Sequence, residues 1–215
     1  MHRVDRGPEP EGLAAVRSRH TLRWVDYHRN HVGKEPGRYW NVFRYELSQV
    51  FFDLCAYCEE YCDGEVDHFR PKSRFPEKTY EWSNWVFACH TCNNIKGKKW
   101  PPGGYVNPCA KTKPAYPESY FTFDTLTGEI LPKEGLTSGR HEKAKQMIDE
   151  LKLNEHHHLK KRRAQLDLVS QVISNDSGDG IATVAFLKKV TRRSERLSSV
   201  TRVILAENDY PVDVD

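Results

Sequence analysis

Cys55-Ala-Tyr-Cys58 and Cys89-His-Thr-Cys92 are two CxxC pairs that enclose the dipeptide Asp67-His68, and Asn93 directly follows the last cysteine. Zinc takes four ligands in a tetrahedron, and thiolates at CxxC spacing supply two ligands each without strain. Two such pairs in one short segment therefore predict a structural zinc site with four thiolate ligands. Its ligands are Cys55, Cys58, Cys89 and Cys92. Cys62 could compete as a ligand, but we expect Cys62 and Cys109 to be reduced core residues.

Asp67, His68 and Asn93 could form a second, open site in the same segment. A hard cation such as Mg²⁺ prefers oxygen ligands, which Asp67 and Asn93 could provide. His68 could then take a proton from a water that attacks phosphorus, because an unperturbed imidazole is largely neutral at pH 7. Three alternatives stay open. The Asp-His pair could be packing residues, His68 could be a zinc ligand, and Asn93 with Asn94 could cap the following helix.

Composition places few limits on function. The chain has 215 residues with 11% aromatic side chains, which suffices for one sizeable domain or for a small domain with helical flanks. No apolar run approaches ~18 residues, so we expect no membrane span. The N-terminal residues lack an apolar signal region, and we expect a cytoplasmic protein with reduced cysteines.

Basic residues gather close to the cysteines, although the formal net charge is only +3. Lysines at such positions can neutralise phosphates without reading bases. We therefore expect nucleic-acid phosphate contacts from Lys72, Lys96, Lys98 and Lys99. No recognition-helix signature is present, so we expect weak sequence preference.

Hydrophobic periodicity and turn residues predict the elements that surround this segment. Helices are expected over 9–31, 38–53 and 92–99, from Ser138, from an N-cap at Asn154 to about 173, and over 181–205. Short strands are expected at 65–69 and 85–88, and a hairpin at 121–130.

The order of motifs resembles that of the HNH (ββα-metal) endonucleases of the zinc-clamped kind. The family pattern is CxxC, Asp-His with a nearby Pro, Asn, and CxxC followed by Asn or His and then Lys. The matching residues here are Cys55 and Cys58, Asp67-His68 with Pro71, Asn84, Cys89 and Cys92, Asn93 and Lys96. The resemblance implies that His68 is the general base and that Asp67 and Asn93 hold a catalytic Mg²⁺ or Mn²⁺. It also implies that Asn84 holds the loop and orients the histidine, and Asn94 is the neighbouring alternative to Asn93.

Motifs outside this core are similar to one subgroup of the family. They resemble motifs of the HNH subunit of Septu-type and retron-linked bacterial anti-phage systems. The motifs are Cys-Ala-Tyr-Cys-Glu59, Asn107-Pro108, the Thr-Gly-Glu-Ile130 hairpin and Leu-Lys-Leu-Asn154. The likeness covers roughly residues 40 to 165. It implies a nuclease that acts beside an ABC-type ATPase subunit. The expected reaction is metal-dependent phosphodiester hydrolysis of nucleic acid, with DNA the expected substrate, leaving 5′-phosphate and 3′-hydroxyl ends.

These inferences predict an α+β protein with a small ββα-metal core and a four-cysteine zinc site between flanking helices. Residues 1–53 are expected to be an N-terminal helical segment, 54–109 the nuclease core with the zinc knuckles, and 110–215 a hairpin and helical region. Two rival functions need the same cysteines or helices. One is a non-catalytic zinc module that binds nucleic acid or protein, and the other is an adaptor whose helices from Ser138 onward bind a partner.

Overall fold

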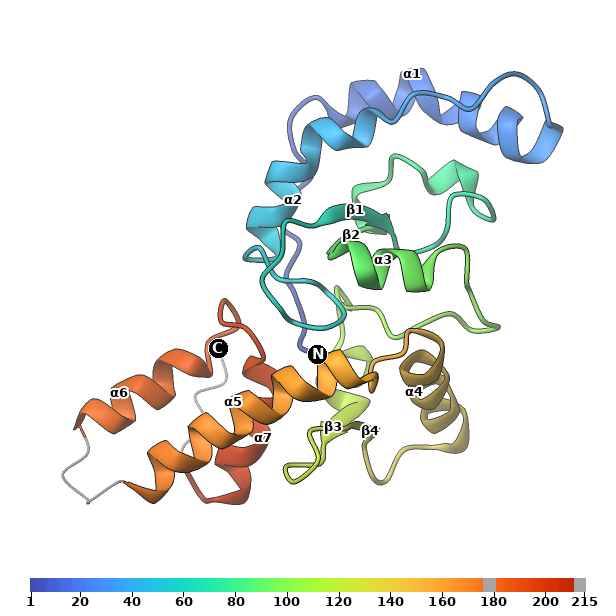
Figure 1. Ribbon diagram of the computed structural model, residues 1–215. Helices are drawn as coiled ribbons and strands as arrows, with labels where there is room; N and C mark the ends of the chain where they lie inside the picture. Colours follow the sequence, from blue (N-terminus) through green and yellow to red (C-terminus); the bar gives the residue numbers. More distant parts are fainter. Residues whose placement is uncertain (176–180, 211–215) are drawn as a thin grey trace.

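The computed structural model describes residues 1–175 and 181–210. Its α-helices are α1 (Leu13–Val25), α2 (Arg44–Val50), α3 (His90–Lys96), α4 (Ser138–Glu150), α5 (His156–Ser174), α6 (Ile181–Val190) and α7 (Ser198–Glu207). Its strands are β1 (Glu65–His68), β2 (Trp85–Ala88), β3 (Phe121–Phe123) and β4 (Ile130–Pro132). Figure 1 shows α1, α2, β1, β2 and α3 at one end of the molecule and the remaining elements at the other.

A two-stranded antiparallel sheet and one helix form the ββα unit. β1 pairs with β2 so that Asp67 lies opposite Val86 and His68 lies opposite Trp85. α3 follows β2 after a single residue, and the sulfur of Cys89 caps it by accepting a hydrogen bond from the backbone N–H of Cys92. The helix ends at Gly97, whose φ of 48° lies in the region that glycine tolerates best. The predicted α+β class with a small ββα unit between helical segments is confirmed.

Aromatic side chains join α1 to the loop between β1 and β2. Trp24, Tyr80 and Trp85 are fully buried. Trp24 Nε1 donates to the Tyr80 hydroxyl at 3.2 Å, and that hydroxyl donates to the carbonyl of Gly37 at 2.9 Å. Large buried aromatic rings contribute much of the packing free energy of a small core. They therefore fix α1 as a wall beside the ββα unit.

The first helix is shorter than the predicted span of 9–31. α1 ends at Val25 and continues as a π-helical turn, Asp26–Asn30, which closes at His31 with a φ of 54°. The wider turn is followed by Gly33 and Pro36, which prevent the helix from continuing.

The other end of the molecule packs helices on the β3–β4 hairpin. The predicted N-cap role of Asn154 is wrong, because Glu155 occupies that position and α5 begins at His156. Asn154 instead bonds the backbone of Ile130 through both its amide oxygen and its amide nitrogen, and its oxygen also accepts from Arg162. It therefore joins the start of α5 to β4.

The predicted single helix over 181–205 is also wrong. The chain turns between α6 and α7, where Leu197 has a φ of 51°. Leu197 N–H donates to the carbonyl of Glu59, and the guanidinium of Arg202 donates to the carbonyl of Thr191. These long-range bonds satisfy the backbone in the turn, and periodicity could not reveal them. Within 1–175 and 181–210, every helix is too short or too polar to cross a membrane.

Candidate active site and metal centre

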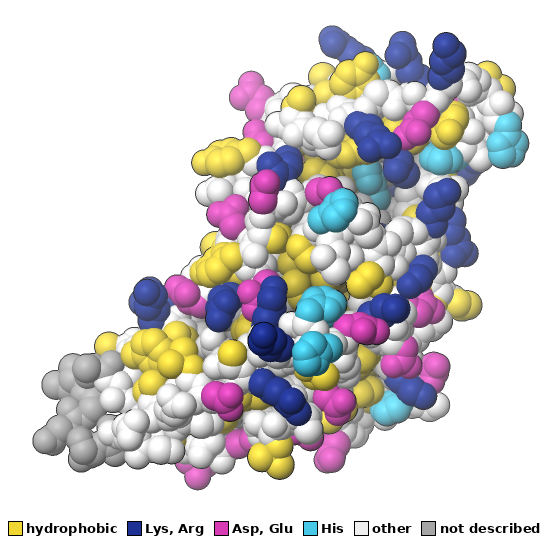
Figure 2. Space-filling model, viewed as in Figure 1, with side chains coloured by type: hydrophobic (Ala, Val, Ile, Leu, Met, Phe, Trp, Pro, Cys, Tyr) yellow, Lys and Arg dark blue, Asp and Glu magenta, His cyan; other side chains and the backbone are white. Residues whose placement is uncertain are grey.

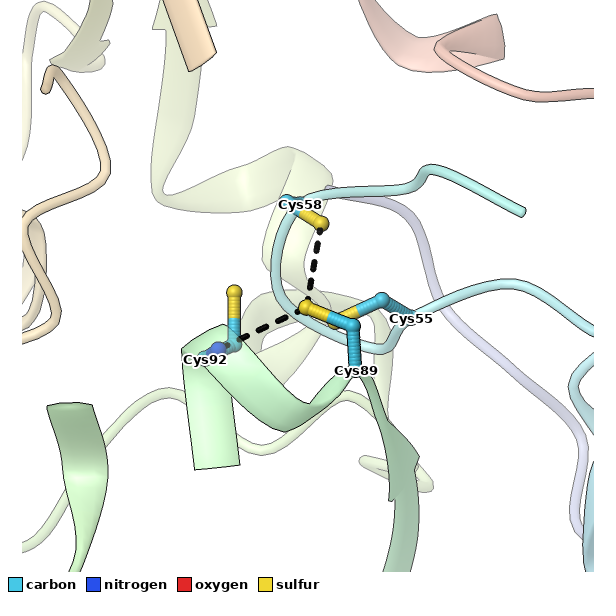
Figure 3. Close-up of side chains that lie close together, drawn as sticks. All are labelled: Cys55, Cys58, Cys89 and Cys92. Atoms are coloured by element: carbon cyan, nitrogen blue, oxygen red, sulfur yellow. Dashed lines mark hydrogen bonds between the residues drawn. The ribbon is translucent and has the colours of Figure 1, made fainter. Parts of the chain in front are cut away.

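Four cysteine sulfurs meet where the loop after α2 approaches the start of α3 (Figure 3). The Sγ atoms of Cys55, Cys58, Cys89 and Cys92 all lie within 4.8 Å of one another, and those of Cys58 and Cys89 are 4.0 Å apart. Tetrahedral zinc with bonds of about 2.3 Å needs sulfurs about 3.8 Å apart. The four ligands predicted for zinc therefore form a group that could hold a metal ion, and Cys62 and Cys109 are not in it.

The thiol cluster is shielded from water on the side of α5. Cys55, Cys58 and Cys92 are buried, and Nε2 of the buried His158 lies 4.0 Å from the sulfur of Cys92. Hydrogen bonds among the four sulfurs lower the pKa of Cys89 and raise the pKa of Cys58 and Cys92, because one thiolate accepts from its thiol neighbours. A closed set of four thiolates leaves no position for a reactive water, so the chemistry of this donor set fits a structural zinc ion.

Asp67 lies on the face of β1 that packs against α3. Its Oδ2 accepts from the hydroxyl of Tyr57 at 2.5 Å, and its Oδ1 accepts from Lys96 Nζ at 2.7 Å. Burial, followed by the charge of Asp67, holds the pKa of Tyr57 well above its usual range, so the phenol remains a donor. Each carboxylate oxygen keeps a second lone pair, so the two bonds do not exhaust the capacity of Asp67 to bind a cation.

Lys96 does not fit the phosphate contact predicted for it. Its side chain is fully buried, and its ammonium group donates both to Asp67 and to the carbonyl of His68 at 2.8 Å. A buried charge is retained only when it is paired and hydrogen-bonded, which is the case here. Lys96 therefore fixes the end of β1 and is not available to a strand of nucleic acid.

His68 is buried at the end of β1, with its ring edge-on to Trp40 at 4.7 Å between centroids. Nε2 lies 2.9 Å from the carbonyl oxygen of Thr79. A carbonyl can only accept, so Nε2 carries the hydrogen and the lone pair lies on Nδ1. Burial, followed by the nearby charge of Lys72, lowers the pKa of His68 to about 3. The imidazole is therefore neutral at physiological pH.

Asn84 closes the loop between the two strands. Its amide nitrogen donates to the carbonyls of Arg70 and Lys78, and its amide oxygen accepts from the backbone N–H of Arg70. These bonds connect the start and the end of the loop that carries Lys72 and Thr79. Asn84 itself does not line the cleft described below.

Asn93 projects from α3 toward Glu65, and its amide nitrogen donates to Glu65 Oε2 at 2.6 Å. The carboxylate can only accept, so it turns the amide oxygen of Asn93 away from itself. Glu65 Oε1 pairs with Nδ1 of His90 at 3.0 Å, and Nε2 of His90 lies 2.8 Å from the amide nitrogen of Asn94. Asn93 and Asn94 thus differ, because only Asn93 bonds the strand directly.

One cleft of about 770 Å³ brings the predicted site residues together. Asp67, His68 and Asn93 line it on the side of the ββα unit, and Lys72 and Lys98 line it as well. The N-terminal segment supplies the rest of the lining, with Trp24, His28, Trp40, Arg38 and Arg44 among its residues. Lys99 is outside this lining, and its ammonium group donates to the carbonyl of Glu150 at 2.8 Å.

Sequence reasoning missed three residues of this site. Glu65 carries the clearest overlooked signal, because it is two positions before Asp67 on a strand and so shares its face. Tyr57 lies inside the first CxxC pair, where its contact with Asp67 depends on how the knuckle docks on β1. His28 comes from a helix that precedes the motif by about 40 residues, and no local pattern connects the two.

Comparisons with known proteins agree with this geometry. Residues 55–99 match the HNH endonuclease family model. The Septu protein PtuB of Bacillus thuringiensis is 32% identical over 118 residues, which is 51% of this chain and 40% of that protein. The chain thus spans well under half the length of this relative. Residues 55–99 therefore form an HNH endonuclease domain, as the motif order predicted.

Proposed function

We propose that this chain is a metal-dependent endonuclease that hydrolyses phosphodiester bonds of nucleic acid, with DNA as the substrate and 5′-phosphate and 3′-hydroxyl ends as products. The observation that carries the proposal is the convergence of Asp67, His68 and Asn93 on one cleft within the segment that matches the HNH model. In this proposal, residues 54–109 are the nuclease core, and the flanking segments 1–53 and 110–215 support it.

His68 acts as the general base. Its Nε2–H is held by the carbonyl of Thr79, and its Nδ1 lone pair takes a proton from the attacking water. The low pKa of about 3 keeps this lone pair free at neutral pH, although it also makes the imidazole a weaker base. Proton removal by a positioned base contributes typically 10²–10⁴-fold to a rate.

Asp67 and Asn93 would hold the catalytic Mg²⁺ or Mn²⁺. Asp67 supplies a carboxylate oxygen, and Asn93 supplies the amide oxygen that Glu65 turns away from itself. A hard cation bound by two protein oxygens and waters can stabilise the charge that develops on the phosphate and on the leaving 3′ oxygen. Lys96 and Tyr57 hold the carboxylate in place, and Asn84 holds the loop that presents Thr79 to His68.

The four-cysteine cluster would hold a structural zinc ion. Cys55 and Cys58 precede β1, and Cys89 and Cys92 follow β2. Zinc bound between them ties the two strands together at the end of the sheet where Glu65 pairs with Ala88. Each strand has only four residues, too few to be stable alone.

We extend the proposed nuclease function to a role in anti-phage defence beside an ABC-type ATPase, which the resemblance supports. The match to a protein named Septu protein PtuB covers 118 residues, which is more than the 45-residue HNH segment. The similarity thus includes residues outside the nuclease motif. The ATPase partner rests on the subgroup resemblance alone.

A plasmid-nicking assay tests the proposed activity. The zinc-loaded chain should convert supercoiled DNA to nicked and linear forms with Mg²⁺ or Mn²⁺, and the products should carry 5′-phosphate and 3′-hydroxyl ends. His68→Ala should abolish cleavage while zinc content and melting temperature persist. Cleavage by His68→Ala at the wild-type rate would contradict the proposal. DNA binding by both proteins without cleavage by either, with the ATPase subunit added, would favour the non-catalytic zinc module.

A further inference from the structure

The wall of the cleft that faces the ββα unit contains an imidazole with no assigned role. His28 lies in the π-helical turn after α1 and lines the same cleft as His68. Its ring stacks on Trp24, with 5.6 Å between centroids and 27° between planes. Its Nε2 is buried yet has no hydrogen-bond partner among the described residues. A buried polar atom without a hydrogen-bond partner is unfavourable, and a bound ligand group would supply the missing partner.

Two lysines line the cleft with His28. In the described part of the chain, neither Lys72 nor Lys98 has a carboxylate within 4 Å of its ammonium group. Lys72 Nζ instead lies 5.3 Å from the ring centroid of Trp24 and 5.5 Å from that of Trp40. Burial lowers the pKa of Lys72, as expected for an ammonium group that lacks a direct partner. The charges of Lys72 and Lys98 also lower the pKa of His28, after the larger effect of burial, while the carboxylate of Glu35, which lines the same cleft, raises it.

The other cations of this wall are already engaged. Arg38 pairs with Glu35, and Arg44 pairs with Asp63 and donates to the carbonyl of Gly64. Among the described lysines and arginines that line the cleft, Lys72 and Lys98 therefore remain for a ligand, and His28 adds a nitrogen without a hydrogen-bond partner. Figure 2 shows more Lys and Arg side chains over α1, so the approach to this end of the molecule is also basic.

We propose that His28, Lys72 and Lys98 form an anion subsite that binds a non-scissile phosphate of the nucleic-acid strand, in the cleft that His68 and Asp67 also line. His28 donates a hydrogen bond from Nε2, while the two lysines supply charge. Trp24 and Trp40 hold Lys72 and His28 from behind. The inference rests on the proposed function, because it describes how the same cleft binds its substrate at a second phosphate besides the reacting one.

The subsite gives α1 and the turn that follows it a role in substrate binding, in addition to their role in packing. In this arrangement the scissile phosphate lies beside His68, and another phosphate of the same strand lies at His28 in the same cleft. The cleft thereby binds the strand through its phosphates and not through its bases. This agrees with the absence of a recognition-helix signature in the sequence.

Binding of a fluorescein-labelled single-stranded DNA oligonucleotide, measured by anisotropy in the His68→Ala background without added divalent ion, tests the subsite. His28→Ala and Lys72→Ala should each weaken binding about tenfold. Lys72→Ala should also lower the slope of log affinity against log salt by about 0.7, the value for one phosphate contact on a single strand. His28→Ala removes a neutral donor and should leave that slope unchanged.

Matched controls come from α4, which does not line the cleft. His141→Ala and Lys145→Ala remove the same groups from exposed positions and should bind as the parent does. His28→Gln keeps an N–H donor and should recover part of the affinity lost in His28→Ala. Melting temperature and zinc content identify any variant that has lost its fold. If His28→Ala has lost its fold, the affinity of His28→Gln is compared with that of the parent.

The outcomes separate the subsite from the catalytic proposal. Affinities within twofold of the parent for both His28→Ala and Lys72→Ala would overturn the subsite, even if the wild-type chain cuts DNA. Weaker binding in both variants, with no cleavage by the wild-type chain even when the ATPase subunit is added, would support the subsite and contradict the proposed function. An equal loss of DNA affinity in His141→Ala or Lys145→Ala would show that the binding is nonspecific, which would overturn the subsite.

Discussion

Lys96 and Asp67 form a buried ion pair, with Nζ 2.7 Å from Oδ1 and no exposed surface on the lysine side chain. The pair links α3 to β1 and sets the position of the carboxylate that would hold the catalytic ion. Lys96→Met should leave Asp67 with an unpaired buried charge and lower the free energy of unfolding by about 3–5 kcal/mol. Urea unfolding of the zinc-loaded protein measures this change.

The exposed Lys145→Met is the control for that substitution, and its effect should stay within about 0.5 kcal/mol. Equal unfolding midpoints for Lys96→Met and wild type would show that the pair contributes nothing to the fold.

Glu65 orients Asn93, so its removal should weaken binding of the catalytic ion without affecting zinc. In Glu65→Ala the amide of Asn93 loses its partner and can rotate. Loss of such an outer hydrogen bond typically costs 10- to 100-fold in metal affinity. Titration with Mn²⁺, followed by electron paramagnetic resonance, measures the affinity. Glu35→Ala removes a carboxylate from the same cleft without touching Asn93 and should change the affinity far less.

The zinc site should depend on four cysteines and not on the other two. Cys58→Ser should reduce bound zinc below the roughly one ion per chain expected for a four-thiolate site and should lower the melting temperature markedly. Cys62→Ser should keep both values, because Cys62 lies outside the sulfur cluster. Zinc release into a chromogenic chelator quantifies the metal. Loss of zinc in Cys62→Ser alone would reassign the ligands.

Asn84 should matter through the loop and not through contact with substrate. Asn84→Ala removes three hydrogen bonds that hold the loop, two to Arg70 and one to Lys78, each worth about 1 kcal/mol. We expect a lower melting temperature, faster proteolysis between residues 70 and 82, and a lower turnover number with little change in DNA affinity. A large loss of DNA affinity at unchanged stability would instead place Asn84 in contact with the substrate.

The sequence predicted the elements whose signals are local. The CxxC spacing identified the four sulfurs, and the brief apolar run at Trp85–Ala88 identified β2. The grouping of Asp67, His68 and Asn93 followed from the family pattern, and the structure places all three on one cleft.

Predictions failed where long-range contacts decide the structure. Lys96 was predicted to contact a phosphate of the nucleic acid, but its side chain is buried and its ammonium group pairs with Asp67. The break between α6 and α7 depends on the carbonyl of Glu59, about 140 residues away. The contribution of α1 to the cleft depends on aromatic packing with Tyr80 and Trp85, which no periodicity reveals.

The most direct test of the central claim is the single-turnover cleavage rate of His68→Ala relative to wild type, at saturating Mg²⁺ and matched zinc content. We predict a rate about 10²–10⁴-fold lower, because the water loses its proton acceptor, while His141→Ala cuts at the wild-type rate. A rate for His68→Ala within twofold of wild type would show that the imidazole held by Thr79 is not the base.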